Sequence, residues 1–212
     1  MCHRFNVKLN LRLIAELFED IQIRFEEIPG TDRYPMSDVA TIRRDGETDQ
    51  WIAELRQWGW LPSHWKPSEN YKTRKKYQRE RFNARSETAD STWGFRRAFA
   101  SQRCVVIGTS FYEPYIGGGE ARYTVQDELF FFAGLWDRWE GEEESVDSCT
   151  MLTTEANPLV AANRTGRPRQ PVILTEIDQV VGYCNPEVTE RTPLNDLLQP
   201  LSEDVMAIHP PE

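Results

Sequence analysis

Long apolar runs are absent from the sequence, which nowhere approaches the roughly 18 consecutive apolar residues of a membrane-spanning helix. The four cysteines lie far apart, with no C-x-x-C pair and no cluster of cysteine and histidine. We therefore expect no zinc or other metal site, and no motif indicates an organic cofactor. The first residues, MCHRFNVKLNLR, lack an apolar run followed by a small-residue cleavage site. We expect no secretory signal, reduced thiols and a cytoplasmic protein.

Internal repeats are also missing, and 212 residues correspond to about one domain. Aromatic residues make up 11% of the sequence, which is far too many for a disordered chain. No linker between independent domains is visible. We therefore expect a single domain over residues 1–212, without a membrane partner and present as a monomer.

Basic residues are fewer than acidic residues, 25 against 34, and the net charge is −9. Positive charge is nevertheless concentrated, because residues 66–103 hold eleven basic and four acidic residues, a net charge of +7. Such a run is commonly a solvated, mobile loop. Interleaved aromatic residues instead favour a groove for single-stranded DNA, which combines phosphate contacts with base stacking. These aromatic residues are Trp65, Tyr71, Tyr77, Phe82, Trp93 and Phe95.

The first part of the chain predicts a helix followed by a hairpin. Residues 11–21 place apolar side chains at helical spacing, and Asn10 is a suitable N-cap. The Asp45-Gly46 pair is a strong turn signal between two candidate strands, residues 36–44 and 50–58.

The remainder predicts mainly strands. Residues 66–80 lack periodicity and predict a long loop, whereas residues 91–100 predict a short helix. From Cys104 onward, apolar segments alternate with turn sequences, and the segment LFFFAGLW is expected to be a buried strand. Short helices are expected at residues 177–183 and 194–198. We expect an α+β fold with an antiparallel, barrel-like β-sheet core and short peripheral helices.

Cys2 is the first candidate for chemistry. If Met1 is removed, Cys2 carries an α-amine beside its thiol, and such a 1,2-aminothiol traps aldehydes as a thiazolidine ring. It could equally act as an N-terminal nucleophile in acyl chemistry. While Met1 is attached, the Cys2 nitrogen is an amide and forms no imine. A small residue near a frayed chain end is the alternative interpretation.

Six sequence blocks occur in a characteristic order along nearly the whole chain. They are MC-x-R-F at the start, WGWLP at 58–62, FNARSET at 82–88, RC-x6-FYE at 103–113, FFFAGLW at 130–136, and TTEANPL from 153 with PVIL ending at 174. In this combination the chain resembles the SOS-response-associated peptidase (SRAP) family, the abasic-site shielding proteins. The resemblance implies a barrel-like α+β fold with a basic channel for single-stranded DNA.

The resemblance also implies which residues act on the lesion. Cys2, as the mature N-terminal residue, would capture the ring-opened aldehyde of an abasic site. Asn83 would lie beside Cys2, and Glu113 would move protons at the sugar, as a sheltered carboxyl can. The alternatives are a turn-forming amide for Asn83 and a carboxylate neutralised by an arginine for Glu113.

Further positions match DNA contacts of the family. Arg4 and Arg85 correspond to phosphate contacts, and Trp65 corresponds to a tryptophan that packs against bases near the lesion. For Arg85, an ion pair with Glu87 is the alternative.

The sequence departs from the family pattern at a histidine. In its place stands Arg164 or Arg167, depending on the direction of counting, and we assign both to DNA binding. Arginine exchanges no proton near neutral pH but can hold a phosphate. His3, in place of the usual glycine, is the candidate substitute. The chain ends at IHPPE and is expected to lack the family's C-terminal strand. These departures indicate a divergent, phage-associated member.

The predicted function is therefore the binding of single-stranded DNA and covalent capture of its abasic sites through Cys2. Two alternatives stay open. The family name suggests a cysteine-dependent peptidase, acting on itself or on other chains. Loss of the histidine would instead leave a DNA-binding module without catalysis.

Overall fold

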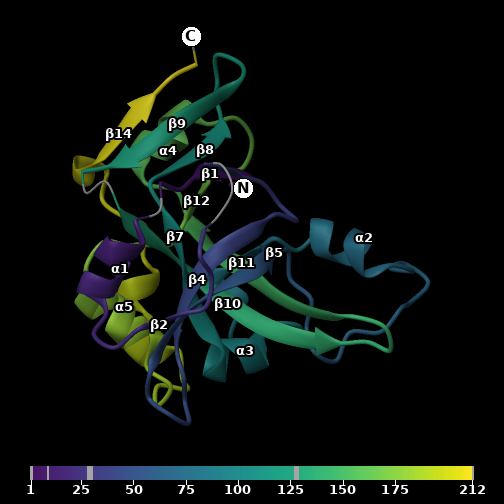
Figure 1. Ribbon diagram of the computed structural model, residues 1–212. Coiled ribbons are helices and arrows are strands. Elements are labelled where there is room, and N and C mark those ends of the chain that lie inside the picture. Colours follow the sequence, from purple (N-terminus) through teal and green to yellow (C-terminus); the bar gives the residue numbers. More distant parts are fainter. Residues whose placement is uncertain (1, 9, 28–30, 127–128, 212) are drawn as a thin grey trace.

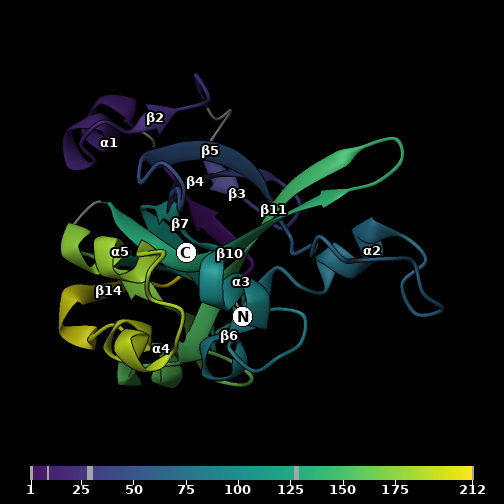
Figure 2. The ribbon, with the colours of Figure 1, turned by 90° about the horizontal axis from the view of Figure 1, so that it is seen from below.

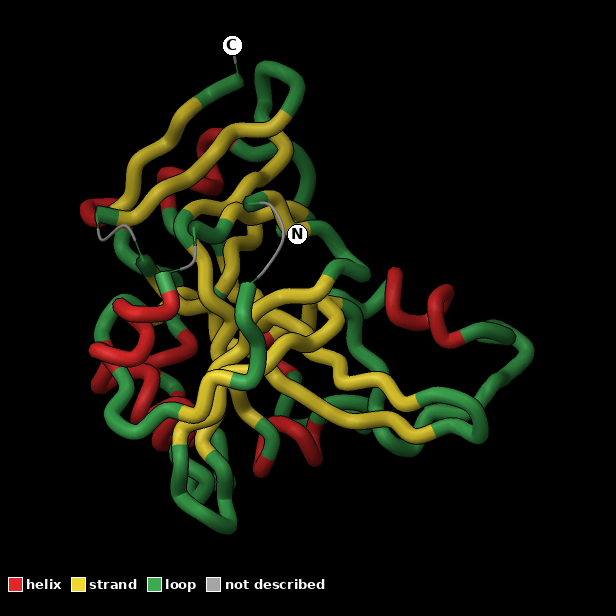
Figure 3. The backbone as a smooth tube through the Cα atoms, in the orientation of Figure 1, coloured by secondary structure: helices red, strands yellow, loops and turns green. Residues whose placement is uncertain are grey.

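The computed structural model describes residues 2–8, 10–27, 31–126 and 129–211, and its helices lie around a central body of strands (Figures 1 and 3). The strands are β1 (Arg4–Asn6), β2 (Gln22–Ile23), β3 (Asp32–Arg33), β4 (Asp38–Arg44), β5 (Trp51–Trp58), β6 (Asn83–Arg85), β7 (Arg103–Gly108), β8 (Ser110–Pro114), β9 (Glu120–Val125), β10 (Phe130–Glu140), β11 (Ser145–Glu155), β12 (Arg169–Pro171), β13 (Ile173–Leu174) and β14 (Met206–His209). The α-helices are α1 (Leu11–Leu17), α2 (Arg74–Arg79), α3 (Arg96–Ser101), α4 (Pro158–Asn163) and α5 (Ile177–Cys184). Short 3-10 helices span Ser86–Thr88, Thr192–Leu194, Asp196–Leu198 and Glu203–Val205.

Five strands of the larger sheet close into a barrel. β10 pairs antiparallel with β7 and β11, β7 with β4, and β4 with β5. The ring closes where β11 runs parallel to β5, with Cys149 opposite Trp58. The expected α+β fold with a barrel-like core and short peripheral helices is confirmed, although this parallel seam was not part of the prediction.

A smaller sheet, in the order β14-β9-β8-β1-β3, packs against the barrel. Its register aligns Phe5, Phe111 and Tyr123 in one row across β1, β8 and β9, and all three side chains are buried. Phe5 meets Phe132 of β10, with ring centroids 5.2 Å apart. β1 is thereby fixed against the core of the molecule.

β10 carries the apolar run FFFAGLW, which was expected to be a buried strand. Phe130, Phe131 and Phe132 are buried, as a strand covered on both faces requires. Gly134 allows a close approach to the neighbouring strand, because a Cβ at this position would lie 2.8 Å from the carbonyl oxygen of Thr150. This part of the prediction is confirmed.

The helices predicted at residues 11–21, 91–100 and 177–183 form with shifted ends, whereas residues 194–198 belong largely to two short 3-10 helices. Asn10 caps α1 by accepting hydrogen bonds from the backbone of Arg12 and Leu13. The helix ends at Leu17, four residues before the predicted end, and Asp20 just beyond it has a left-handed backbone conformation. The helix predicted at 91–100 occupies only Arg96–Ser101.

The loop predicted over residues 66–80 is wrong at its end, where α2 forms. Thr73 caps this helix, and its buried Gln78 donates to the carbonyl oxygen of Gly59 at 2.8 Å. Arg74 forms two hydrogen bonds of 2.6 Å with Glu144 in the turn between β10 and β11. α2 and this hairpin therefore project on the same side of the molecule (Figures 1 and 2). Tertiary contacts hold a segment that is too short to show helical periodicity.

The described chain ends with a short strand, β14, that was not predicted from the sequence. β14 pairs antiparallel with β9, with Ile208 opposite Tyr123. The exposed edge of β9 accepts the short segment MAIH as a partner, and the absence of the family's own C-terminal strand stays a prediction.

Candidate active site

Cys2 lies two residues before the start of β1 and is fully buried. Its thiol donates to the backbone oxygen of Arg4 at 3.4 Å. Asn83, the first residue of β6, donates from Nδ2 to the backbone oxygen of Cys2 at 2.7 Å. β6 runs parallel to β11, so the barrel wall sets the position of this amide. The Oδ1 atom of Asn83 is buried and has no hydrogen-bond partner among the described residues.

Glu113 approaches Cys2 from β8. It follows Tyr112, which lies opposite Arg4 in the pairing of β1 with β8. Its side chain is fully buried, and burial raises the pKa of the carboxyl although the charge of Arg164 opposes the shift. Burial also raises the pKa of the Cys2 thiol, and the nearby charge of Glu113 raises it further. Both groups therefore tend to retain protons.

Arg164 is the arginine that reaches Glu113. Its Nε donates to Glu113 Oε2 at 2.7 Å, and its Nη1 donates to the backbone oxygens of Thr165 and Arg167. Only 6% of the Arg164 side chain is exposed, whereas Arg167 lies at the surface. Of the two positions considered for the family histidine, Arg164 is the one in contact with the predicted acid/base residue.

His3 and Arg4 are held by acidic residues that the sequence did not single out. His3 Nε2 lies 2.6 Å from Glu120 Oε1. Arg4 donates from Nε to Asp32 at 2.8 Å and from Nη1 to Glu120 at 3.3 Å. The Arg4 guanidinium also lies over the ring of Tyr112, 4.1 Å from its centroid.

Arg85 ends β6 and is exposed at the surface. It lines a cavity of about 340 Å³ together with Asn83. The alternative ion pair with Glu87 does not form, because Arg169 binds both carboxylate oxygens of Glu87 at 3.0 and 2.7 Å. Arg85 has no ion-pair partner among the described residues, and its guanidinium is accessible to an anion.

Trp65 belongs to a group of aromatic side chains. Its ring centroid lies 5.8 Å from that of Trp139 and 6.0 Å from that of Tyr77. Trp65 and Tyr77 line a cavity of about 310 Å³, to which His64 and the 66% exposed Trp93 also belong. This cavity offers ring faces at the surface, which is the property a base-stacking site requires.

The basic segment predicted at residues 66–103 is divided between surface and core. Arg103 is buried and donates to five backbone oxygens, among them those of Tyr183 and Asn185, so it is a structural residue. Eight other basic residues are exposed: Lys66, Lys72, Lys75, Lys76, Arg79, Arg85, Arg96 and Arg97.

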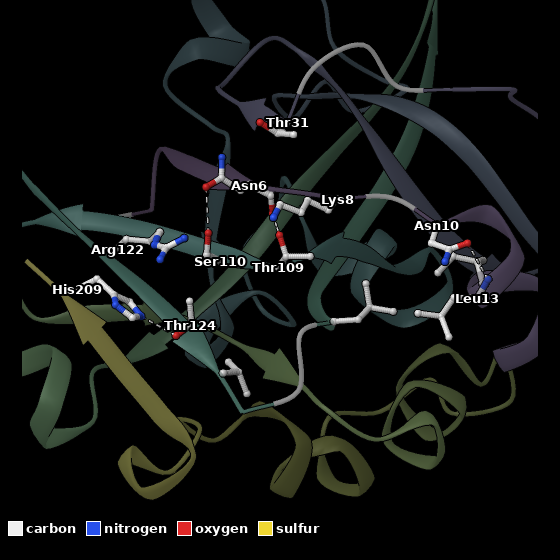
Figure 4. Close-up of a pocket in the computed structure, with 13 residues that line it drawn as sticks. Asn6, Lys8, Asn10, Leu13, Thr31, Thr109, Ser110, Arg122, Thr124 and His209 are labelled. Atoms are coloured by element: carbon white, nitrogen blue, oxygen red, sulfur yellow. Dashed lines mark hydrogen bonds between the residues drawn. The ribbon is translucent and has the colours of Figure 1, made fainter.

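A larger cavity, of about 550 Å³, lies elsewhere. Figure 4 shows Arg122 of β9 and His209 of β14 at one end of this cavity. Asn10 and Leu13, at the start of α1, lie at its other end. None of the site residues predicted from the sequence is among the described residues that line it.

Tyr123 is a further group that sequence reasoning missed. Burial and the charge of Glu113, which lies on the paired strand β8, raise the pKa of its hydroxyl to about 12. The alternation in ARYTV places Ala121, Tyr123 and Val125 on one face and could have indicated that Tyr123 points inward. Nothing local to the sequence indicates its neighbour Glu113.

Among the described residues, no group of three or more His, Cys, Asp or Glu side chains could hold a metal ion. None of the helices in the described ranges is long and apolar enough to cross a membrane.

The chain belongs to the SOS response associated peptidase (SRAP) family, whose sequence pattern it matches over residues 1–211. It is 31% identical to the abasic site processing protein YoqW of Bacillus subtilis over 214 residues, covering 97% of this chain and 90% of that protein. A protein of the same name in Bacillus phage SPbeta matches to the same extent.

Solved structures share this fold. A protein of Bordetella bronchiseptica superimposes with a TM-score of 0.80 at 28% identity, covering 98% of each chain. A protein of Bacteroides thetaiotaomicron gives a TM-score of 0.83 at 21% identity over 98% of this chain and 91% of that chain, a likeness of fold.

Proposed function

We propose that this protein binds single-stranded DNA and captures abasic sites covalently through Cys2, which shields the lesion. The observation that carries the proposal is the meeting of Cys2, Asn83 and Glu113 at the start of β1. The relatives named as abasic site processing proteins support DNA carrying such a lesion as the substrate.

In the proposed reaction, removal of Met1 frees the α-amine of Cys2. The amine adds to the aldehyde carbon of the opened sugar, and loss of water gives an imine. The Cys2 sulfur then adds to the imine carbon, and the thiol proton passes to nitrogen, which closes a thiazolidine ring. Because burial raises the pKa of the thiol, we place amine attack before sulfur attack.

Two neighbours would assist these steps. Opening the cyclic sugar and dehydrating the first adduct both need a proton donor, and the buried carboxyl of Glu113 is suited to this role. The buried Oδ1 of Asn83 can accept a hydrogen bond from the amine or from a sugar hydroxyl. His3 pairs with Glu120, and we propose that it acts on the reaction indirectly through this pair.

Exposed cations and ring faces would hold the strand. Arg85 lies beside Asn83 at the cavity of about 340 Å³, close to the reacting residue. We assign Trp65 and its aromatic neighbours to base stacking, and Arg4 and Arg167 to the phosphate path, the surface along which the DNA phosphates run. Arg164, which was also predicted to bind DNA, has a largely buried side chain that holds Glu113 instead.

Incubation with an abasic single-stranded oligonucleotide tests the proposal. We expect a denaturation-stable adduct whose mass is that of the Met1-free chain plus the oligonucleotide minus one water. A chain that keeps Met1 and an oligonucleotide without the lesion are the controls. Absence of an adduct from the Met1-free chain contradicts capture, and hydrolysis of peptide substrates by that chain would instead support the peptidase.

Replacing Arg85 by alanine should weaken binding to intact and abasic single strands by the same factor, because a phosphate contact carries no base information. Loss of one such contact should flatten the plot of log K against log salt by about 0.7. Fluorescence anisotropy at several salt concentrations measures both effects, with the exposed Arg122→Ala as matched control. Unchanged binding together with a lower melting temperature would assign Arg85 a structural role.

A further inference from the structure

Arg4 is a cation of the predicted phosphate path, yet carboxylates already occupy it. Its Nε is bound by Asp32 at 2.8 Å and its Nη1 by Glu120 at 3.3 Å, while its flat face lies on Tyr112. Arginine binds carboxylate and phosphate through the same planar arrangement of donors. A DNA phosphate must therefore compete with these two acids for Arg4.

The two acids are fixed by the sheet. Asp32 in β3 also accepts from Nδ2 of Asn6 at 2.9 Å, and β3 pairs with β1. Glu120 begins β9, on the other side of β8, and its second oxygen lies 2.6 Å from Nε2 of His3. Carboxylates from β3 and β9, the strands that flank β1 and β8, thus converge on His3 and Arg4, the two residues that follow Cys2. We call Asp32 and Glu120 the acidic clamp.

We propose that the acidic clamp determines specificity by weakening the noncovalent hold on undamaged single strands. Intact and abasic strands carry the same phosphates, so phosphate contacts alone do not distinguish them. A clamp that occupies Arg4 and repels phosphate shortens every noncovalent encounter. A strand with an aldehyde is still retained, because the bond to Cys2 does not depend on phosphate affinity. The selectivity part of this inference rests on the proposed capture function.

The partial exposure of these groups makes the clamp displaceable. The side chains of Arg4 and Glu120 are each 28% exposed and that of Asp32 is 41% exposed. Ion pairs at this exposure are weak, so a phosphate can displace them at a moderate cost. The clamp therefore reduces affinity without closing the site.

The test is the variant Asp32→Asn/Glu120→Gln, which removes two charges with little change in shape. Anisotropy with an intact single-stranded oligonucleotide should show binding that is about three- to thirtyfold tighter. The plot of log K against log salt should steepen by up to about 0.7, because Arg4 becomes available to a phosphate. A matched control, Asp178→Asn/Glu187→Gln, removes two exposed charges on α5 and just after it.

Arg4→Ala separates release of Arg4 from a general change in charge. In the Arg4→Ala background the clamp variant should gain no more affinity than the control variant gains. Equal gains in the clamp and control variants, or an unchanged affinity and salt slope, overturn the proposal.

A capture assay on the same proteins completes the test. The ratio of abasic adduct to retained intact strand, measured in a mixture of both oligonucleotides, should fall in the clamp variant. If the unmodified protein forms no adduct, the proposed function fails, while the binding assays on intact strands still decide whether the clamp withholds Arg4.

Discussion

Replacing Cys2 by alanine is expected to abolish the denaturation-stable adduct with abasic DNA. A thiazolidine needs the sulfur atom, and alanine leaves only an amine that can form a reversible imine. Binding to an intact single strand should stay within about threefold, because affinity comes mainly from cations and ring faces away from the sulfur. Gel analysis under denaturing conditions, without a reducing trap, measures the adduct.

Two further measurements make this result specific. Borohydride reduction should recover an adduct from the Ala variant, since it fixes the imine formed by the remaining amine. Because Cys2 is fully buried, the melting temperature of each variant must be compared with that of the unmodified protein, and Cys2→Ser provides a variant of nearly the same size. A full yield of stable adduct from Cys2→Ala without borohydride contradicts the thiazolidine.

The local patterns of the sequence predicted much of the fold. The run FFFAGLW predicted a buried strand, and Asp45-Gly46 predicted the hairpin between β4 and β5. The parallel pairings of β11 with β5 and β6 could not be predicted in this way. They join segments far apart in the chain and are selected by closure of the barrel, which leaves no short-range signal. α2 was missed for the same reason, because the hydrogen bond from its Arg74 to Glu144 joins segments far apart in the chain.

The candidate site shows the same difference between residues found from local sequence patterns and residues that depend on nonlocal contacts. Cys2, Asn83 and Glu113 were named from sequence blocks, and the structure brings them together from the segment before β1, from β6 and from β8. The acidic clamp was missed, because a surface aspartate and a turn-flanking glutamate have no distinguishing pattern. Arg103 is the opposite case, a residue that the sequence grouped with the DNA-binding cations although it is structural. It was counted with the basic segment, but its five backbone contacts depend on how α3 and α5 pack.

Arg164 bears on the prediction that an arginine stands where the family has a histidine. Since Arg164 contacts Glu113 and Arg167 lies at the surface, Arg164→His is the substitution that places a titratable group against the proposed proton donor. This choice required the structure, because counting along the sequence gave two equal candidates. Glu113 itself is the more decisive position.

Glu113→Gln is expected to slow adduct formation by about 10²- to 10⁴-fold, the usual contribution of one general acid or base. The amide has nearly the same shape but leaves Arg164 as a buried cation without its partner. Glu113→Gln/Arg164→Gln removes both charges and controls for this effect. If the loss of a proton donor is responsible, both variants are slow; recovery of the rate in the double variant contradicts the role of Glu113. The exposed Glu187→Gln should leave the rate unchanged.

The pH dependence gives an independent test with a definite sign. Burial raises the pKa of Glu113, so its carboxyl keeps a proton to a higher pH than an exposed glutamate does. As the pH rises through this raised pKa, the unmodified protein loses its proton donor, whereas Glu113→Gln has none to lose. Deprotonation of the Cys2 amine accelerates both proteins alike. The ratio of the two rates, unmodified over variant, should therefore be largest at low pH and decline as the pH rises. A ratio that does not change with pH in single-turnover measurements would assign Glu113 a structural role.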